Sequence, residues 1–220
     1  MTKTFRVLSL LGAAALISMA ASANTSLAVT NAAAIDGNFG LEVIFDGTTT
    51  NAFVEDQTPA DESTYNVEFK LRANNLTILA ANDATSRHEV FAGRFPANLI
   101  RMEIHCRLAP GGPGTGNCGP GNDGQWRAKA YARNDNNTWK FCGQTGFVPT
   151  GNTTYQIEWV QGSGGADGSI RFLKNGVEVR LCNNVDNDDR GINAARMGAT
   201  GRVDATTSGT SHMDSFVSTR

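Results

Sequence analysis

The feature that most constrains this chain is a strict alternation of apolar and polar residues in several separate segments. In the clearest one, 100–108, even-numbered positions are apolar and odd-numbered positions are charged or histidine. Segments 65–72, 126–133 and 155–159 alternate in the same way. A period of two puts successive side chains on opposite faces of a strand, so that one face can be buried while the other stays polar. The pattern predicts strands in all four segments.

Shorter strand candidates fill the intervals between these segments. They are 41–45, 52–55, 76–80, 89–94, 138–142, 169–174, 177–181, 192–198 and 212–218. Asn175-Gly176 between two of them is a strong signal for a two-residue hairpin turn. Glycine-rich stretches at 110–124 and 162–168 indicate loops. Because no segment beyond the first 23 residues has a helical period, the chain predicts an all-β, two-layer antiparallel sandwich.

The first 23 residues have the three parts of a cleavable secretory signal. Lys3 and Arg6 are basic, 7–21 is apolar, and Ala21-Ser22-Ala23 supplies the small residues that a signal peptidase reads. The apolar run is shorter than the roughly 20 residues that a membrane-spanning helix needs. We therefore expect cleavage after residue 23, a single domain over 24–220 with a mobile segment at 24–35, and no integral membrane segment. The protein is expected to be secreted or periplasmic, and the short signal suggests a bacterial source.

The charge of the chain argues against a nucleic-acid partner. The net charge is −2 with histidine neutral. Removing Lys3 and Arg6 leaves 17 basic and 21 acidic residues, a net charge of −4. A mildly acidic chain without a basic block lacks the electrostatic footprint of a nucleic-acid-binding protein.

All four cysteines follow the signal, and an even number in an exported chain indicates two disulfides. Three pairings are possible. We favour Cys106–Cys118, which would close a loop rich in glycine and proline, together with Cys142–Cys182. The alternative, a metal site, is not expected, because no Cys-x-x-Cys pair exists and the three histidines are far apart in the sequence.

Two segments carry a resemblance to a known superfamily. Tyr155-Gln-Ile-Glu-Trp159, followed by the hairpin 168–176, resembles a hallmark of concanavalin A-like sandwiches, in particular laminin-G-like domains. The segments 197–199, 207–210 and 213–220 are similar to the closing strands of such modules in bacterial secreted proteins. The resemblance covers about residues 36–220 and implies a jelly-roll architecture. Its motifs are structural and do not name a ligand.

No catalytic motif stands out. Glucan-cleaving relatives of this fold carry a Glu-x-Asp-x-x-Glu cluster on one strand, whereas Glu103 and Glu158 each stand alone on theirs. A pair assembled from these two across strands is the alternative to solvated positions on an exposed sheet face. A Gly-x-Ser-x-Gly elbow is absent, and His88-Glu89 lacks the second histidine of a zinc protease. We therefore expect that the chain is not an enzyme.

Polar residues that share strand faces form a candidate binding surface for a sugar or an anionic polymer, with Tyr131 as a stacking platform. The candidate ligand-binding residues are Arg101, Glu103, His105, Arg127, Lys129, Tyr131 and Glu158. The alternative is an ordinary wet face of an antiparallel sheet, which mixed charges commonly fill. The three tryptophans are expected in the core or in hairpin packing, with Trp139 the best candidate for exposure.

Residues 183–189 form the densest run of oxygen ligands in the chain. Asp186, Asp188 and Asp189 are candidate calcium ligands, and calcium is the one cofactor that the sequence suggests, although none is required. The run is not an EF-hand, because Arg190 and Met197 stand at its fifth and twelfth positions. The alternative is a polar turn between strands.

The leading functional hypothesis is therefore a secreted, non-enzymatic module that binds carbohydrate or a cell-surface polymer. A structural or adhesive subunit that self-associates, with 24–35 as an exchanged edge strand, is the alternative from another class. A glycan hydrolase is the third.

Overall fold

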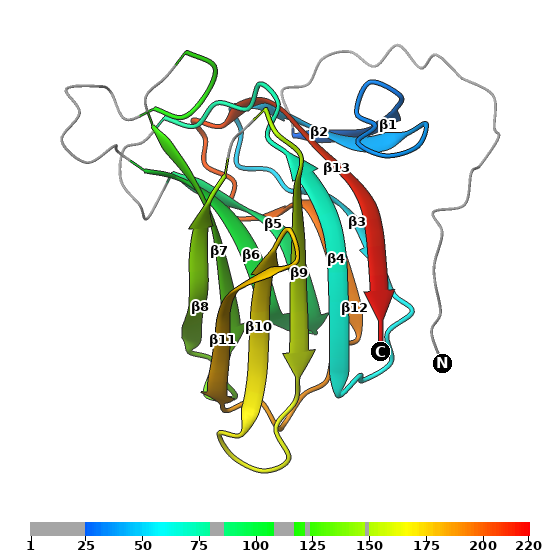
Figure 1. Cartoon of the computed structure of the whole chain (residues 1–220), viewed down its shortest axis with the longest axis vertical. Helices are drawn as coiled ribbons and strands as arrows, with labels where there is room; N and C mark the ends of the chain where they lie inside the picture. Colours follow the sequence, from blue (N-terminus) through cyan, green and yellow to red (C-terminus); the bar gives the residue numbers. More distant parts are fainter. Residues whose placement is uncertain (1–24, 80–85, 108–116, 122–123, 148–149) are drawn as a thin grey trace.

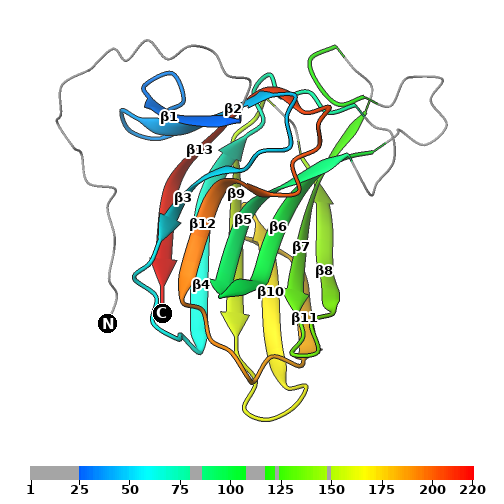
Figure 2. The ribbon, with the colours of Figure 1, turned by 180° about the vertical axis from the view of Figure 1, so that it is seen from behind.

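The computed structural model describes residues 25–79, 86–107, 117–121, 124–147 and 150–220. Within these ranges the chain forms thirteen strands and no helix. The strands build two antiparallel sheets that pack face to face, the seven-stranded one nearer the viewer in Figure 1 and the six-stranded one nearer in Figure 2. The predicted all-β, two-layer antiparallel sandwich is confirmed.

Each sheet mixes strands from distant parts of the chain. The seven-stranded sheet runs in the order β1 (Ser26–Thr30), β2 (Gly40–Asp46), β13 (Ser208–Thr219), β4 (Thr64–Arg72), β9 (Thr153–Val160), β10 (Gly168–Lys174), β11 (Val177–Val185). The six-stranded sheet runs in the order β3 (Ala52–Asp56), β12 (Ala194–Gly201), β5 (Arg87–Phe95), β6 (Ala97–Arg107), β7 (Gln125–Arg133), β8 (Trp139–Gly146).

The four alternating segments of the sequence lie in strands β4, β6, β7 and β9. Among the shorter candidates, 76–80 differs most from expectation. Its described residues make only isolated bridges, Thr77 with Ser208 and Ile78 with Cys118, and Ala80 lies outside the described residues. The segment 24–35 contains β1, which pairs with β2 of its own chain. The predicted signal, 1–23, also lies outside the described residues.

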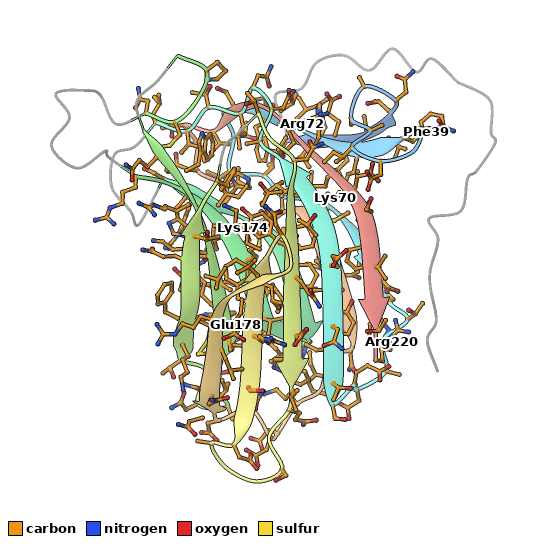
Figure 3. The ribbon with its side chains drawn as sticks, in the orientation of Figure 1. Phe39, Lys70, Arg72, Lys174, Glu178 and Arg220 are labelled. Atoms are coloured by element: carbon orange, nitrogen blue, oxygen red, sulfur yellow. A yellow bond between two sulfur atoms is a disulfide. The ribbon has the colours of Figure 1, made fainter. Side chains whose placement is uncertain are left out.

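The core fills the space between the two sheets with the apolar face of each alternating strand. In β4 these residues are Tyr65, Val67, Phe69 and Leu71, each at most 1% exposed. Burying such a side chain contributes about 1.5–3 kcal/mol. The opposite face of β4 carries Lys70 and Arg72, and Figure 3 shows both on the outer side of the seven-stranded sheet, together with Glu178 of β11.

Two disulfides join parts of the sandwich that the sheets alone leave apart. Cys106–Cys118 ties β6 to the segment before β7, and Cys142–Cys182 joins β8 to β11, the edge strands of opposite sheets. The pairing is the one favoured from the sequence. The sequence separations of 12 and 40 residues correspond to about 3 and 4 kcal/mol of unfolded-state restriction. Lys140 reinforces the second junction by donating from Nζ to the Asn183 and Asn184 carbonyls at 2.8 and 2.6 Å.

The hairpin between β10 and β11 turns as its sequence predicts. Asn175 and Gly176 have φ angles of +51° and +74°. A two-residue type I′ turn needs positive φ at both positions, which asparagine and glycine adopt with least strain.

Among the described residues, the structure has no helix of the length and hydropathy that membrane crossing requires.

His88 is the one histidine whose side chain enters the hydrophobic core. It is fully buried, its ring lies 4.7 Å from that of Phe45, and neither ring nitrogen has a hydrogen-bond partner in the described part of the chain. Burial lowers its pKa from 6.5 to about 3, because the core disfavours the imidazolium, and the charge of nearby His105 adds to the effect. His88 therefore stays neutral in the folded protein at neutral and mildly acidic pH.

Below pH 6.5 the unfolded chain takes up a proton at His88 that the folded chain does not, until the pH nears 3. This residue alone should thus reduce the free energy of unfolding by about 1.4 kcal/mol for each pH unit in that window. We expect His88→Leu to lose this contribution. Urea unfolding of the parent protein and the variant at pH 7.5 and pH 4.5 measures this contribution. The assignment is contradicted if the difference in free energy of unfolding between parent and variant is the same at both pH values.

Candidate functional site

The outer face of the six-stranded sheet brings most of the predicted ligand-binding residues together. Antiparallel pairing of β6 with β7 places Arg101 opposite Tyr131, Glu103 opposite Lys129, and His105 opposite Arg127. Directly opposed residues of two strands share a face. Six of the seven predicted residues therefore form one surface, which we call the β6–β7 face.

The seventh residue, Glu158, lies elsewhere. It belongs to β9 in the seven-stranded sheet, where it accepts an ion pair from Arg171 at 3.3 Å. The pair of Glu103 with Glu158 considered from the sequence is therefore wrong, since the two carboxylates project from different sheets. Sequence reasoning had placed both on strands but had no means of assigning the strands to sheets.

The expectation that Glu103 is a solvated surface residue is also wrong. Glu103 is fully buried, and Arg101 and His105 are 4% and 1% exposed. Their cover comes from other elements. The Arg101 guanidinium lies 3.8 Å from the centre of the Trp139 ring, at the start of β8, and 4.7 Å from the centre of the Tyr131 ring. Arg202, beyond the end of β12, reaches over both Glu103 and Glu89.

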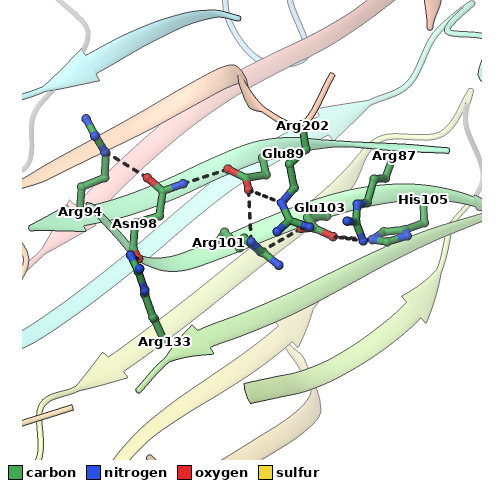
Figure 4. Close-up of polar contacts among 9 residues, drawn as sticks. All are labelled: Arg87, Glu89, Arg94, Asn98, Arg101, Glu103, His105, Arg133 and Arg202. Carbon is green, nitrogen blue, oxygen red and sulfur yellow. Dashed lines mark hydrogen bonds and ion pairs between the residues drawn. The ribbon is translucent and has the colours of Figure 1, made fainter. Parts of the chain in front are cut away.

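Beneath this cover lies a network of ion pairs (Figure 4), which we call the buried ion network and which comprises Arg87, Glu89, Arg101, Glu103, His105 and Arg202. Arg101 Nε lies 2.8 Å from Glu103 Oε1, and an Arg101 terminal nitrogen lies 3.5 Å from Glu89 Oε1. Arg202 bridges the same two carboxylates at 3.2 and 3.6 Å. Glu89 is thus shared by two guanidinium groups and Glu103 by three, since a terminal nitrogen of Arg87 also lies 3.9 Å from Glu103 Oε2.

The network shifts the pKa values of its two carboxylates in opposite directions. Burial raises the pKa of Glu89 above its ordinary value, and the charges of Arg101 and Arg202 oppose this effect only in part. Burial acts on Glu103 in the same direction, but the hydrogen bond from His105 and the charges of Arg101 and Arg87 outweigh it, so the pKa of Glu103 is lowered. Glu103 is therefore the firmly ionised member of the pair.

His105 completes the network at the end nearest Arg87. Its Nε2 donates to Glu103 Oε2 at 2.6 Å. Burial lowers the pKa of His105, and the Glu103 contact opposes that shift without cancelling it. The ring is consequently neutral at pH 7, with its proton on Nε2.

The rings and cations of β7 and β8 form the outermost layer of this face. Tyr131 and Phe141 are cross-strand partners whose ring centres lie 5.6 Å apart, and Phe141 is 42% exposed. Arg127 is half-buried and donates to Gln125 at 2.7 Å. Trp139 is half-buried, while Trp126 and Trp159 are in the core as predicted.

Several residues on this side of the sheet were not predicted from the sequence, among them Arg87, Glu89, Asn98 and Arg202. A register shift in the pairing of β5 with β6 lies between Glu89 and Phe91. Strict alternation would put these two residues on one face, but the shift sends Glu89 outward and Phe91 into the core. Asn98 then donates to Glu89 at 2.9 Å. The only sequence signal for Glu89 is a carboxylate directly before the apolar run 90–92.

The candidate calcium ligands are brought together only in part. Carboxylate oxygens of Asp186 and Asp188 lie within 4.8 Å of each other and of Asp135, which comes from the turn between β7 and β8. Asp189 is not in this group, and its backbone N–H donates to Asp135 Oδ2 at 3.1 Å. Burial raises the pKa of Asp135, and the negative charge of Asp189 adds to it. Calcium binding stays a prediction, with Asp135 in place of Asp189 as the third carboxylate.

If calcium does bind there, excess calcium over chelator should raise the Tm of the purified protein, because a ligand that binds only the folded state stabilises it. Asp135→Asn should reduce the shift, whereas Asp167→Asn, in another exposed loop, should leave it unchanged. Equal melting temperatures in calcium and in chelator would contradict the predicted calcium site.

Comparison with known proteins gives relatives in fold only. The chain matches no protein-family model and no curated protein. Among solved structures, the cellulose-induced protein Cip1 has a TM-score of 0.54 at 12% identity, covering 89% of this chain and 86% of that one. The binding domain of Paraclostridial mosquitocidal protein 1 has a TM-score of 0.51 at 8% identity, covering 90% and 43%. The catalytic domain of a glycoside hydrolase family 131 protein from Coprinopsis cinerea has a TM-score of 0.44 at 15% identity, covering 89% and 77%.

The two matches with TM-scores above 0.5 define the fold class of the protein. The chain is a jelly-roll β-sandwich, as the resemblance to concanavalin A-like proteins implies. The narrower relation to laminin-G-like domains stays a prediction. The two disulfides fit a protein of an oxidising compartment outside the cytoplasm.

The comparisons correct the prediction that the chain is not an enzyme. Solved structures that match it include an alginate lyase and a carbohydrate esterase, besides the glycoside hydrolase named above. Sequence reasoning had excluded enzymes because it found no known catalytic motif on a single strand. The two carboxylates of the buried ion network come from β5 and β6, so a search along single strands could not group them.

Proposed function

We propose that this chain binds a carbohydrate outside the cytoplasm, and that the binding site is the β6–β7 face with the adjoining rings of β8. The observation that carries the proposal is the partly exposed Tyr131–Phe141 pair set among hydrogen-bond donors. A sugar ring has an apolar face that packs on an aromatic ring and an edge of hydroxyl groups that hydrogen-bond. Both requirements are met at one place on this sheet.

The buried ion network supports this proposal by making the surface rigid. Arg101 is fixed by Glu103 below, and it in turn lies against the Tyr131 and Trp139 rings. A binding surface whose side chains are already held loses little conformational entropy when the ligand arrives. In this proposal Arg127, Lys129 and Tyr131 contact the ligand, whereas Arg101, Glu103 and His105 position them.

Removing the ring of Phe141 should weaken glycan binding about tenfold, or ~1.4 kcal/mol, the scale of a central contact residue. A glycan array followed by calorimetry on the best ligand, comparing the parent protein with Phe141→Ala and Tyr131→Leu, measures this. Tyr131→Phe keeps the ring and should keep most of the affinity.

The matched control is Phe39→Ala. Phe39 is 61% exposed on the β1–β2 side of the molecule, away from this face (Figure 3). The proposed site is wrong if Phe39→Ala and Phe141→Ala reduce affinity equally, or if no glycan binds.

Cleavage of the bound glycan is a second candidate, favoured by the two carboxylates of the buried ion network. Glu89 and Glu103 are cross-strand partners whose pKa values are shifted in opposite directions, up for Glu89 and down for Glu103. Acid–base pairs in enzymes show this separation, with the raised group as the acid. Arg202, whose side chain is 35% exposed, covers both carboxylates and would have to give way to a substrate.

Should the protein cleave glycans by this pair, Glu89→Gln would abolish product formation while glycan binding, though weakened, stays measurable. Incubation with a panel of polysaccharides, with detection of new reducing ends and of unsaturated products, tests it. Glu158→Gln, on the opposite sheet, should retain full activity. Undiminished cleavage by Glu89→Gln would exclude this role for the pair.

A further inference from the structure

The outer face of the six-stranded sheet carries far more positive than negative charge. Its described cations are Arg87, Arg94, Arg101, Arg107, Arg127, Lys129, Arg133, Arg196 and Arg202, and its described carboxylates are Glu55, Glu89 and Glu103. Nine cations against three carboxylates leave an excess of six. The whole chain has a net charge of −2, so this face is opposite in sign to the rest of the molecule.

The excess is concentrated on β7. The three carboxylates pair with cations of β5, β6, β12 and the residue Arg202. Arg127, Lys129 and Arg133 of β7 have no carboxylate partner in the described part of the chain. Arg127 donates to the neutral Gln125 side chain, and Arg133 reaches the Asn98 carbonyl at 3.5 Å.

These three cations lie with Tyr131 in one row along β7. Residues two apart on a strand share a face and are about 6.8 Å apart, so the row reads cation, cation, ring, cation at regular intervals. All four side chains are half-buried rather than fully extended into solvent. A ligand that matches the row is an extended chain with a negative group on successive units and a ring face for Tyr131.

We propose that the glycan bound by this protein is a linear acidic polysaccharide lying along β7, with its carboxylate or sulfate groups paired to Arg127, Lys129 and Arg133. The inference rests on the proposed function and adds the ligand class. A neutral glycan would leave three unpaired cations at the centre of the site, whereas a polyanion pairs each of them. Binding should weaken as salt is added, because partly exposed ion pairs are screened.

The experiment measures binding of the purified protein to four soluble polymers: a polyuronate, a sulfated polysaccharide, a neutral polysaccharide of similar length and double-stranded DNA. We expect tight, salt-dependent binding to the polyuronate or the sulfated polymer, and which of the two binds better identifies the anionic group. The combined variant Arg127→Gln, Lys129→Gln, Arg133→Gln should lose about tenfold or more in affinity.

The control variant is Arg180→Gln, an exposed cation on β11 of the other sheet, which should bind like the parent. Circular dichroism of the combined variant establishes that it is folded. Preferential binding of the neutral polymer, unaffected by the combined variant, would overturn the acidic ligand while leaving the proposed carbohydrate site in place. Binding of DNA as strong as that of the polysaccharides would overturn it as well, because charge alone would then suffice. Absence of binding to every polysaccharide would instead overturn the proposed function.

Discussion

The burial of the Glu103 carboxylate is the constraint on which the arrangement of the outer face depends. An ionised carboxylate away from water is tolerated only if cations and hydrogen-bond donors surround it. Here Arg101, Arg202, Arg87 and His105 do so from four different positions in the chain. Arg101 in turn lies against the rings of Trp139 and Tyr131. The partners of this one buried charge thus connect side chains of β5, β6, β7 and β8.

A buried network of this kind is weak evidence for stability. Apolar residues of similar volume often serve stability as well or better, whereas removing one partner leaves an uncompensated charge at a cost of about 3–5 kcal/mol. The stability of the sandwich rests on its apolar core and on the disulfide that joins the edges of the two sheets. The burial of the Glu89 and Glu103 carboxylates is therefore better explained by a surface whose side chains must be held in place. Such a site is expected to lose specificity before the protein unfolds.

Much of the fold could be predicted from the sequence, because strand faces follow from local alternation. Segment 100–108 shows what alternation can predict and what it cannot. Alternation correctly put Arg101, Glu103 and His105 on one face of β6 and Ile104 on the other. It could not show that the polar face is covered, because the cover comes from Trp139, 36 residues beyond Glu103, and from Arg202, 99 residues beyond it. Burial of a strand on both faces is a tertiary property.

The remaining misses have the same physical origin. Glu89 faces outward because of a register shift that the residue pattern does not predict. Glu158 belongs to the other sheet because strand order is set by long-range pairing. Asp135 meets Asp186 across more than 50 residues because the turn after β7 lies against the loop after β11. In each case the sequence indicated the chemistry of the residue but did not indicate which residues would surround it.

The distribution of charge on the outer face follows from the same network. Because the Glu89 carboxylate is shared by two guanidinium groups and the Glu103 carboxylate by three, neither has capacity left for the cations of β7. Glu55, at the far edge of the sheet, is paired with Arg94 and Arg196. Neutralisation of Arg127, Lys129 and Arg133 would require a fourth carboxylate on this face, and the described residues supply none. The positive row along β7 is thus a consequence of how the buried charges are satisfied, and a bound anion is the natural group to complete it.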